Sequence, residues 1–242
     1  MQFEDFKPLF HTVMALNGFE RFADDNKSRM FHALTERMLE VNEKMNLTAI
    51  KSVDSIILLH YVDSLTAERF LPQNARVADI GCGAGFPCLP LALCRPDLSL
   101  LAVDSTEKRI NYVKDTARLL NCPNLEAVAM RAEDGGKGAY REQFDVCTAR
   151  AVAALPALSE LCLPYVKVGG KFLAMKGKRG EEELQVAQSA IKQLGGECVG
   201  VHKVTLTYNG EEDTRFLFEI AKVKPTPADL PRPWAKILKK PL

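Results

Sequence analysis

The sequence lacks a paired-cysteine motif, a long hydrophobic run and an excess of charge of either sign. Its seven cysteines are odd in number and none belongs to a Cys-x-x-Cys pair, which argues against a disulfide framework and a zinc site. No apolar run approaches the roughly 20 residues that a membrane-spanning helix needs, and the first residues are acidic where a signal peptide is basic. We therefore expect a cytoplasmic protein that binds no metal and no membrane.

Charge is present, but it is unevenly distributed along the chain. The net charge of +1 gives no global argument for nucleic-acid binding. Residues 1–70 hold 8 basic and 11 acidic side chains, whereas residues 222–242 hold 6 basic side chains against Asp229 alone. Any contact with nucleic acid is therefore expected to depend on local basic clusters.

The hydrophobic pattern changes near residue 70. Up to that point apolar residues such as Phe31, Leu34 and Met38 recur at helical spacing, and we expect about three helices. From Arg76 onward short apolar runs alternate with helix-length segments, which is typical of a parallel sheet with crossover helices. The runs expected to form strands are 77–80, 98–103, 125–130, 144–147, 171–175, 197–206 and 214–223, and the helix-length segments are 90–93, 107–120, 155–166 and 181–194.

The last two runs predict an antiparallel hairpin, because a Tyr-Asn-Gly-Glu-Glu-Asp turn and no helix separates them. Five parallel strands with a terminal hairpin indicate an α/β fold with the Rossmann-like, seven-stranded, mostly parallel sheet of class I S-adenosylmethionine methyltransferases. We predict an N-terminal helical extension over residues 1–70, a methyltransferase domain over 71–224, and a basic, proline-rich tail over 225–242.

A glycine loop follows the first expected strand, with Gly81, Gly83 and Gly85 at alternate positions. Glycines let the backbone approach a ligand closely, and the next helix offers unpaired N–H groups, so the loop indicates a nucleotide-like ligand or a tight turn without one. Dinucleotide enzymes use Gly-x-Gly-x-x-Gly to seat a pyrophosphate. A carboxylate at Asp79 would repel a pyrophosphate but suits the ammonium and sulfonium groups of S-adenosylmethionine. The spacing therefore favours S-adenosylmethionine.

Acidic residues follow two further strands. Asp104 ends the second strand, where its carboxylate can accept hydrogen bonds from both hydroxyls of a ribose, as it also does in NAD enzymes. Ala132-Glu133 follow the third strand, where such a pair commonly flanks an adenine in methyltransferases. Asp134 beside them is equally suited to cap a helix. Together with the glycine loop, these residues predict a cofactor pocket.

The fourth expected strand carries none of the familiar acceptor motifs. No Asn-Pro-Pro-Tyr or Asp-Pro-Pro-Tyr occurs to orient an exocyclic amine, and Cys147 lacks the preceding proline of enzymes that attack cytosine through a thiolate. We expect Cys147 to be a core residue, as buried free cysteines often are. Purine N7 has an in-plane lone pair and needs alignment rather than a general base, so a site without an obvious base is compatible with N7 methylation.

Short segments spread over nearly the whole chain resemble one family. The most specific are Asn46-Leu47-Thr48 and the His-x-x-Asp-Ser-Leu pattern of residues 60–65. Further matches are the glycine loop, Val103-Asp104-Ser105 with Lys108-Arg109, Arg131-Ala132-Glu133, Ala149-Arg150-Ala151-Val152, Lys176-Gly177, and Leu230-Pro231-Arg232 with Pro241-Leu242. On these segments the chain resembles ribosomal RNA small subunit methyltransferase G, also called glucose-inhibited division protein B.

The resemblance implies methylation at N7 of one guanine in bacterial 16S rRNA, with S-adenosylmethionine as donor and 16S rRNA or the 30S subunit as partner. It implies cofactor contacts at Gly81, Phe86, Asp104, Ser105, Thr106, Ala132, Glu133 and Arg150. Cysteines at 82 and 88 depart from the serine, threonine or glycine that is common there, but all three loop glycines are kept. No protein partner is indicated, and we expect a monomer.

Four residues are candidates for the acceptor side: Asn46, His60, Asp63 and Arg150. His60 and Asp63 share one face of an expected helix with Ser64. That face either meets the acceptor or forms a buried hydrogen-bond cluster that joins the N-terminal helices to the sheet. Asn46 is either part of an active-site wall or a helix cap.

Three basic residues follow the fifth strand at the ligand-binding edge of the sheet. Lys176, Lys178 and Arg179 either contact RNA phosphates or form a solvated basic loop. Three other functions stay open at this point: a small-molecule methyltransferase, a non-catalytic module that binds S-adenosylmethionine and RNA, and a nicotinamide dehydrogenase.

Overall fold

A seven-stranded sheet forms the centre of the protein. The computed structural model describes residues 1–242, with strands β1 (Arg76–Ile80), β2 (Ser99–Asp104), β3 (Leu125–Ala129), β4 (Phe144–Arg150), β5 (Val166–Lys176), β6 (Gly196–Tyr208) and β7 (Glu211–Lys222). Their order in space is β3-β2-β1-β4-β5-β7-β6. The first five strands run parallel, and β7 lies antiparallel to both β5 and β6. The mostly parallel sheet with a terminal hairpin is thus confirmed.

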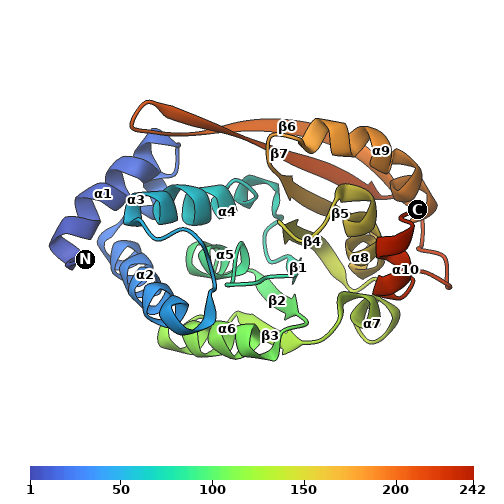
Figure 1. Cartoon of the computed structure of the whole chain (residues 1–242), viewed down its shortest axis with the longest axis horizontal. Coiled ribbons are helices and arrows are strands. Elements are labelled where there is room, and N and C mark those ends of the chain that lie inside the picture. The colour runs from blue at the N-terminus through green and yellow to red at the C-terminus, as the bar shows by residue number, and fades with distance from the viewer.

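Helices cover both faces of the sheet (Figure 1). They are α1 (Phe3–Leu16), α2 (Asp25–Met45), α3 (Val53–Ile56), α4 (Asp63–Leu65), α5 (Cys88–Cys94), α6 (Glu107–Leu119), α7 (Ala132–Lys137), α8 (Leu155–Cys162), α9 (Gly180–Gln193) and α10 (Trp234–Lys239), with a π-helical turn η2 (Ile57–Val62) and 3-10 turns η1 (Glu20–Phe22), η3 (Glu68–Phe70) and η4 (Leu163–Tyr165). The N-terminal helices share one apolar core with α5 and α6, whereas α8, α9 and α10 pack in a second core on the other face. None of the helices combines the length and apolar character needed to cross a membrane.

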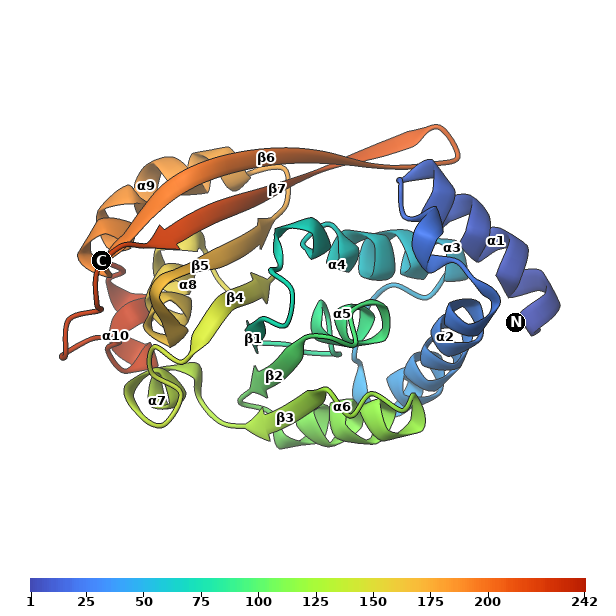
Figure 2. The same ribbon diagram turned by 180° about the vertical axis from the view of Figure 1, so that it is seen from behind.

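The N-terminal helices are packed against the rest of the chain by aromatic contacts and by the β6–β7 hairpin. Phe31 of α2 lies 4.8 Å from the ring of Tyr61 in η2 and 5.0 Å from that of Phe10 in α1. The hairpin reaches beyond the sheet to α1 (Figure 2). There the Asn17 side chain accepts a hydrogen bond from the Thr207 N–H at 2.9 Å and donates one to its carbonyl at 3.0 Å.

Three elements differ from the expected pattern. β5 begins at Val166 rather than at 171, because the expected helix ends in η4 and Val166 already pairs with Phe144 of β4. The helix α10 was not expected, and for α7 (Ala132–Lys137) only a possible helix cap at Asp134 was considered. A methyl group at Gly135 of α7 would lie only 2.1 Å from the Tyr165 hydroxyl, so packing on η4 demands a residue that is a poor helix former. Cys147 is fully buried in the sheet, as expected.

Candidate functional site

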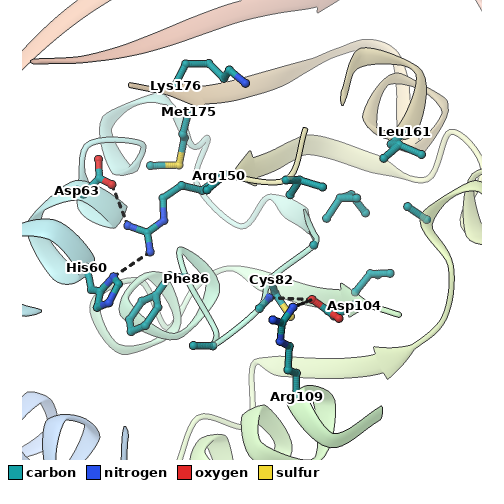
Figure 3. Close-up of a pocket in the computed structure, with 18 of the residues that line it drawn as sticks. His60, Asp63, Cys82, Phe86, Asp104, Arg109, Arg150, Leu161, Met175 and Lys176 are labelled. Atoms are coloured by element: carbon teal, nitrogen blue, oxygen red, sulfur yellow. Dashed lines mark hydrogen bonds and ion pairs between the residues drawn. The ribbon is translucent and has the colours of Figure 1, made fainter. Parts of the chain in front are cut away.

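A cavity of about 830 Å³ opens at the carboxyl ends of β1 and β4. The chain order of the sheet reverses between these two strands, and ligands of doubly wound folds bind at such a switch point. Most of the expected residues line the cavity: His60, Asp63, Gly81, Gly83, Phe86, Asp104, Ser105, Thr106, Ala132, Glu133, Arg150 and Lys176 (Figure 3). Asn46, Asp79, Gly85, Lys178 and Arg179 do not line it.

The glycine loop bends tightly from β1 toward α5. Gly81 and Gly85 have φ angles of 72° and 87°, and a methyl group on either would come within 2.5 Å of a Val152 or Leu89 carbon. Gly83 also has a positive φ, 57°, but a methyl group there would meet only the Gly81 carbonyl oxygen, at 3.9 Å on the cavity wall. Packing therefore requires glycine at two positions, while the third leaves room for a ligand beside the backbone.

Asp104 is held at the cavity wall by backbone N–H groups. Its Oδ1 accepts a hydrogen bond from the Thr106 N–H at 2.8 Å, and its Oδ2 accepts one from the Gly83 N–H at 3.1 Å. Arg109 lies 3.8 Å from the same carboxylate. Each carboxylate oxygen has a second lone pair, so Asp104 retains the capacity to accept from two ligand hydroxyls.

Asp79 lies behind the glycine loop rather than in the cavity. The buried carboxylate accepts hydrogen bonds from the Cys88 N–H at 3.2 Å and the Thr148 hydroxyl at 3.3 Å. Burial raises the pKa of Asp79 to about 6. The side chain fixes the start of α5 against β1 and β4 and does not line the cavity, so any attraction between Asp79 and the cationic groups of a cofactor would act from behind the loop.

Arg150 joins the N-terminal segment to the end of β4. Its Nη1 donates to the Leu59 carbonyl at 2.7 Å and to Asp63 Oδ2 at 2.8 Å, and its Nη2 donates to His60 Nδ1 at 3.1 Å (Figure 3). Because a guanidinium can only donate, His60 Nδ1 is the acceptor. The ring proton therefore sits on Nε2, which lies 2.9 Å from the Thr48 hydroxyl. Burial and the Arg150 charge lower the pKa of His60 to about 3, so the ring is neutral.

His60 also forms part of an aromatic wall. Its ring stacks on Phe86 with centroids 4.5 Å apart and planes 7° from parallel, and the Arg150 guanidinium lies 5.3 Å from the Phe86 centroid. The two sequence-based interpretations of His60 and Asp63 are therefore compatible. The same residues form a buried cluster between the helices and the sheet and line the cavity.

Arg215 of β7 is a cavity residue that the sequence did not reveal. Its Nε lies 3.3 Å from Asp63 Oδ1, and its Nη1 bonds Asp213 at 2.7 Å. Asp63 is thus held between two arginines. The sequence predicts a hairpin but not which side chains of β7 face the N-terminal helices. That information comes from the register of β7 on β5 and β6, so Arg215 could not be predicted from the sequence. Arg109, Arg131 and Trp234 also line the cavity without having been expected to.

The basic residues after β5 do not act as a group. Lys176 is buried, and its Nζ lies 2.7 Å from both the Ala153 carbonyl and Glu183. Its ammonium is therefore engaged inside the protein, so Lys176 is not part of a solvated basic loop. Lys178 and Arg179 are 71% and 85% exposed and remain candidates. Asn46 is an exposed left-handed C-cap of α2 that does not line the cavity, although its neighbour Leu47 does.

The doubly wound sheet, the glycine loop at its switch point and the terminal hairpin define the class: this is the fold of class I S-adenosylmethionine-dependent methyltransferases. The solved structure of an S-adenosylmethionine-dependent methyltransferase from Aquifex aeolicus shares the fold, with a TM-score of 0.52 and 17% sequence identity. The match covers 77% of this chain and 98% of that chain.

Sequence comparison identifies the family. The sequence model of the rRNA small subunit methyltransferase G family matches residues 27–209 of this chain. The chain is 44% identical over 221 residues to ribosomal RNA small subunit methyltransferase G of Lactobacillus delbrueckii subsp. bulgaricus, covering 89% of this chain and 92% of the relative. It is 45% identical over 217 residues to the protein of the same name from Macrococcus caseolyticus, covering 89% and 90%. The chain belongs to the rRNA small subunit methyltransferase G family.

Proposed function

We propose that this protein transfers the methyl group of S-adenosylmethionine to N7 of a guanine in 16S rRNA. Family membership carries the proposal, because relatives more than 40% identical over most of the chain are named as methyltransferases of the small-subunit rRNA. The nicotinamide dehydrogenase is not supported, since the glycine loop and hairpin belong to the methyltransferase fold.

The cavity fits the proposed cofactor. Gly83 leaves open space beside the loop, and Asp104 presents a fixed carboxylate to a ribose. Ala132 and Glu133 line the wall farther along, where an adenine would lie. When bound, S-adenosylmethionine supplies an electrophilic methyl group on a sulfonium sulfur.

The acceptor side suits an atom that needs no deprotonation. Both nitrogens of neutral His60 are engaged, by Arg150 and Thr48, and Asp63 is held between two arginines. None of these groups has to take a proton when guanine N7 is methylated, because N7 already presents a lone pair. Their role is to hold the wall formed by His60 and Phe86, so that the acceptor is aligned and water is excluded.

Methyl transfer to defined RNA tests the proposal. The purified protein is incubated with methyl-labelled S-adenosylmethionine and either free 16S rRNA or 30S subunits from cells that lack the modification. We expect label on one guanine, recovered as 7-methylguanosine. Folded protein that binds S-adenosylhomocysteine yet labels neither substrate would contradict the proposal, and this outcome would favour the non-catalytic module.

The salt dependence of rRNA binding distinguishes an rRNA methyltransferase from a small-molecule methyltransferase. The double variant Lys178→Ala, Arg179→Ala removes two exposed charges beside the cavity, and we expect weaker rRNA binding with a smaller dependence on salt. Lys192→Ala, an exposed lysine at the far end of α9, is the matched control. Equal affinity and salt dependence in all three proteins would favour a small-molecule substrate.

A further inference from the structure

The last residues of the chain are anchored to the domain rather than solvated. We name residues 224–242 the C-terminal arm. Arg232 bonds Glu160 of α8 through its backbone N–H at 2.8 Å, Nε at 2.8 Å and Nη2 at 2.6 Å. The Glu160 side chain is fully buried, so this ion pair is a specific anchor rather than a surface contact.

A second arginine, Arg141, anchors the arm by donating hydrogen bonds to the arm's backbone carbonyl groups. Arg141 donates to the carbonyl oxygens of Thr226 at 2.6 Å, Pro227 at 3.0 Å and Leu230 at 2.8 Å. Its Nη1 also donates to the carbonyl of Gly136 in α7, so one guanidinium joins the arm to that helix. The path of the arm past α7 is therefore determined by hydrogen bonds on both sides.

The anchored arm places Trp234 at the cavity. Its backbone N–H donates to Glu133 Oε1 at 3.2 Å, and the half-buried Trp234 is one of the residues that line the cavity together with Ala132 and Glu133. Figure 1 shows α10, which begins at Trp234, beside α7 and α8. Residues about a hundred positions apart thus form one wall.

We propose that Trp234 is a positioning residue for the adenine of the cofactor, and that the C-terminal arm is a part of the cofactor site. This inference rests on the proposed function, which places an adenine beside Ala132 and Glu133. An indole offers a large, rigid apolar surface on which a purine packs. The Trp234 N–H orients the Glu133 carboxylate, which can accept a hydrogen bond from the exocyclic amine of adenine.

The chain contains a single tryptophan, which makes the proposal directly measurable. The protein is titrated with S-adenosylhomocysteine while tryptophan emission is recorded, and binding is measured in parallel by calorimetry. We expect a saturable change in emission that follows the calorimetric curve. Adenosine should produce the same change and methionine should not.

Substitution tests the contribution of the indole. Trp234→Ala keeps the backbone N–H to Glu133 and removes only the side chain, and we expect about tenfold weaker binding of S-adenosylhomocysteine, which corresponds to ~1.4 kcal/mol. Trp234→Phe should retain more affinity because it keeps an aromatic face. Leu238→Ala, on the exposed side of the same helix, is the control and should bind as the parent does.

The outcomes separate this inference from the proposed function. Calorimetric binding with unchanged emission, or Trp234→Ala with parental affinity, would overturn the role of Trp234 and leave the methyltransferase proposal intact. An emission change caused by methionine rather than adenosine would overturn the placement of the adenine. If calorimetry detects no S-adenosylhomocysteine binding to the folded parent, the proposed function itself fails.

Discussion

At the residue scale, burial keeps His60 neutral, and the donor-only chemistry of Arg150 decides which ring nitrogen carries the proton. Arg150 donates to Nδ1, the proton lies on Nε2, and the pKa is lowered to about 3. A histidine acting as general base would lose activity as the pH falls through about 6.5. Neutral His60 in a positioning role has no such dependence.

We therefore expect single-turnover methylation of rRNA to show no ionisation attributable to His60 between about pH 5.5 and 8. The measurement compares the pH profile of the parent with that of His60→Gln. The variant should be slower, because the stack on Phe86 is lost, but its profile should have the same shape. A limb near pH 6.5 in the parent that vanishes in the variant would show that His60 is the base.

The raised pKa of Asp79 predicts that the free energy of unfolding depends on pH. Its pKa is raised from 3.8 to about 6, so the native state binds this proton more tightly than the unfolded state. The resulting stabilisation is fully present below about pH 4 and is lost as the pH rises through about 6. Asp79→Asn keeps the site neutral, so its free energy of unfolding should exceed that of the parent by on the order of 3 kcal/mol at pH 7, and by much less at pH 4.

Urea unfolding at a series of pH values measures this difference, and Asp145→Asn is the control of opposite sign. Hydrogen bonds from Lys167 and the Arg76 N–H hold the pKa of Asp145 below its usual value, so that variant should lose stability at neutral pH. A difference between Asp79→Asn and the parent that does not change from pH 4 to pH 7 would contradict the burial of an ionisable Asp79.

Individual site residues were predictable where the strand end determined their place. Asp104 and Arg150 lie at the carboxyl ends of β2 and β4, the two strands that flank β1, and both line the cavity. Asp79 also lies near a strand end, but it points behind the loop. Lys176 ends β5, but its ammonium forms an ion pair with Glu183. Contacts made after folding, not the positions in the sequence, decide these two cases.

At the element scale, the ion pair between Arg232 and buried Glu160 is expected to contribute most of the charge-dependent anchoring of the C-terminal arm. Arg232→Ala would leave the buried Glu160 carboxylate without its partner, and we expect a loss of about 3–5 kcal/mol in the free energy of unfolding. Denaturant unfolding measures the loss. Arg179→Ala breaks an exposed pair with Glu182 and should change stability by less than about 1 kcal/mol.

A double variant makes this prediction specific. Adding Glu160→Gln to Arg232→Ala removes the unpaired charge, so part of the lost stability should return. An Arg232→Ala protein as stable as the parent would mean that the arm is not anchored in solution.

Helices and strands were predictable from the sequence when their own residues favour that secondary structure. The amphipathic pattern of α2 favours a helix, and the apolar runs of β1 and β2 favour buried strands. α7 does not, because Gly135 and Gly136 disfavour a helix and only packing on Tyr165 and Pro164 requires them. α10 follows a proline-rich segment and is held by contacts with α8, which local sequence does not encode.

At the scale of the whole molecule, the β6–β7 hairpin and the N-terminal helices stabilise each other through hydrogen bonds between Asn17 and Thr207. Asn17→Ala would remove both hydrogen bonds to Thr207, and we expect a loss of about 1–3 kcal/mol in the free energy of unfolding. Denaturant unfolding checks it, with Asn26→Ala on the exposed side of α2 as control. No difference between these two variants would mean that the tip of the hairpin does not bind α1.

The long sequence separations within the cavity wall have a kinetic consequence. Arg150 meets His60 across 90 positions of sequence, and Trp234 meets Glu133 across 101. Outside the wall, Asn17 meets Thr207 across 190 positions. Contacts of such high contact order form late, because long loops must close first. A partly folded chain can therefore hold much of the central sheet without holding a pocket. In refolding, recovery of ligand binding should coincide with the slowest folding phase rather than with the appearance of helix.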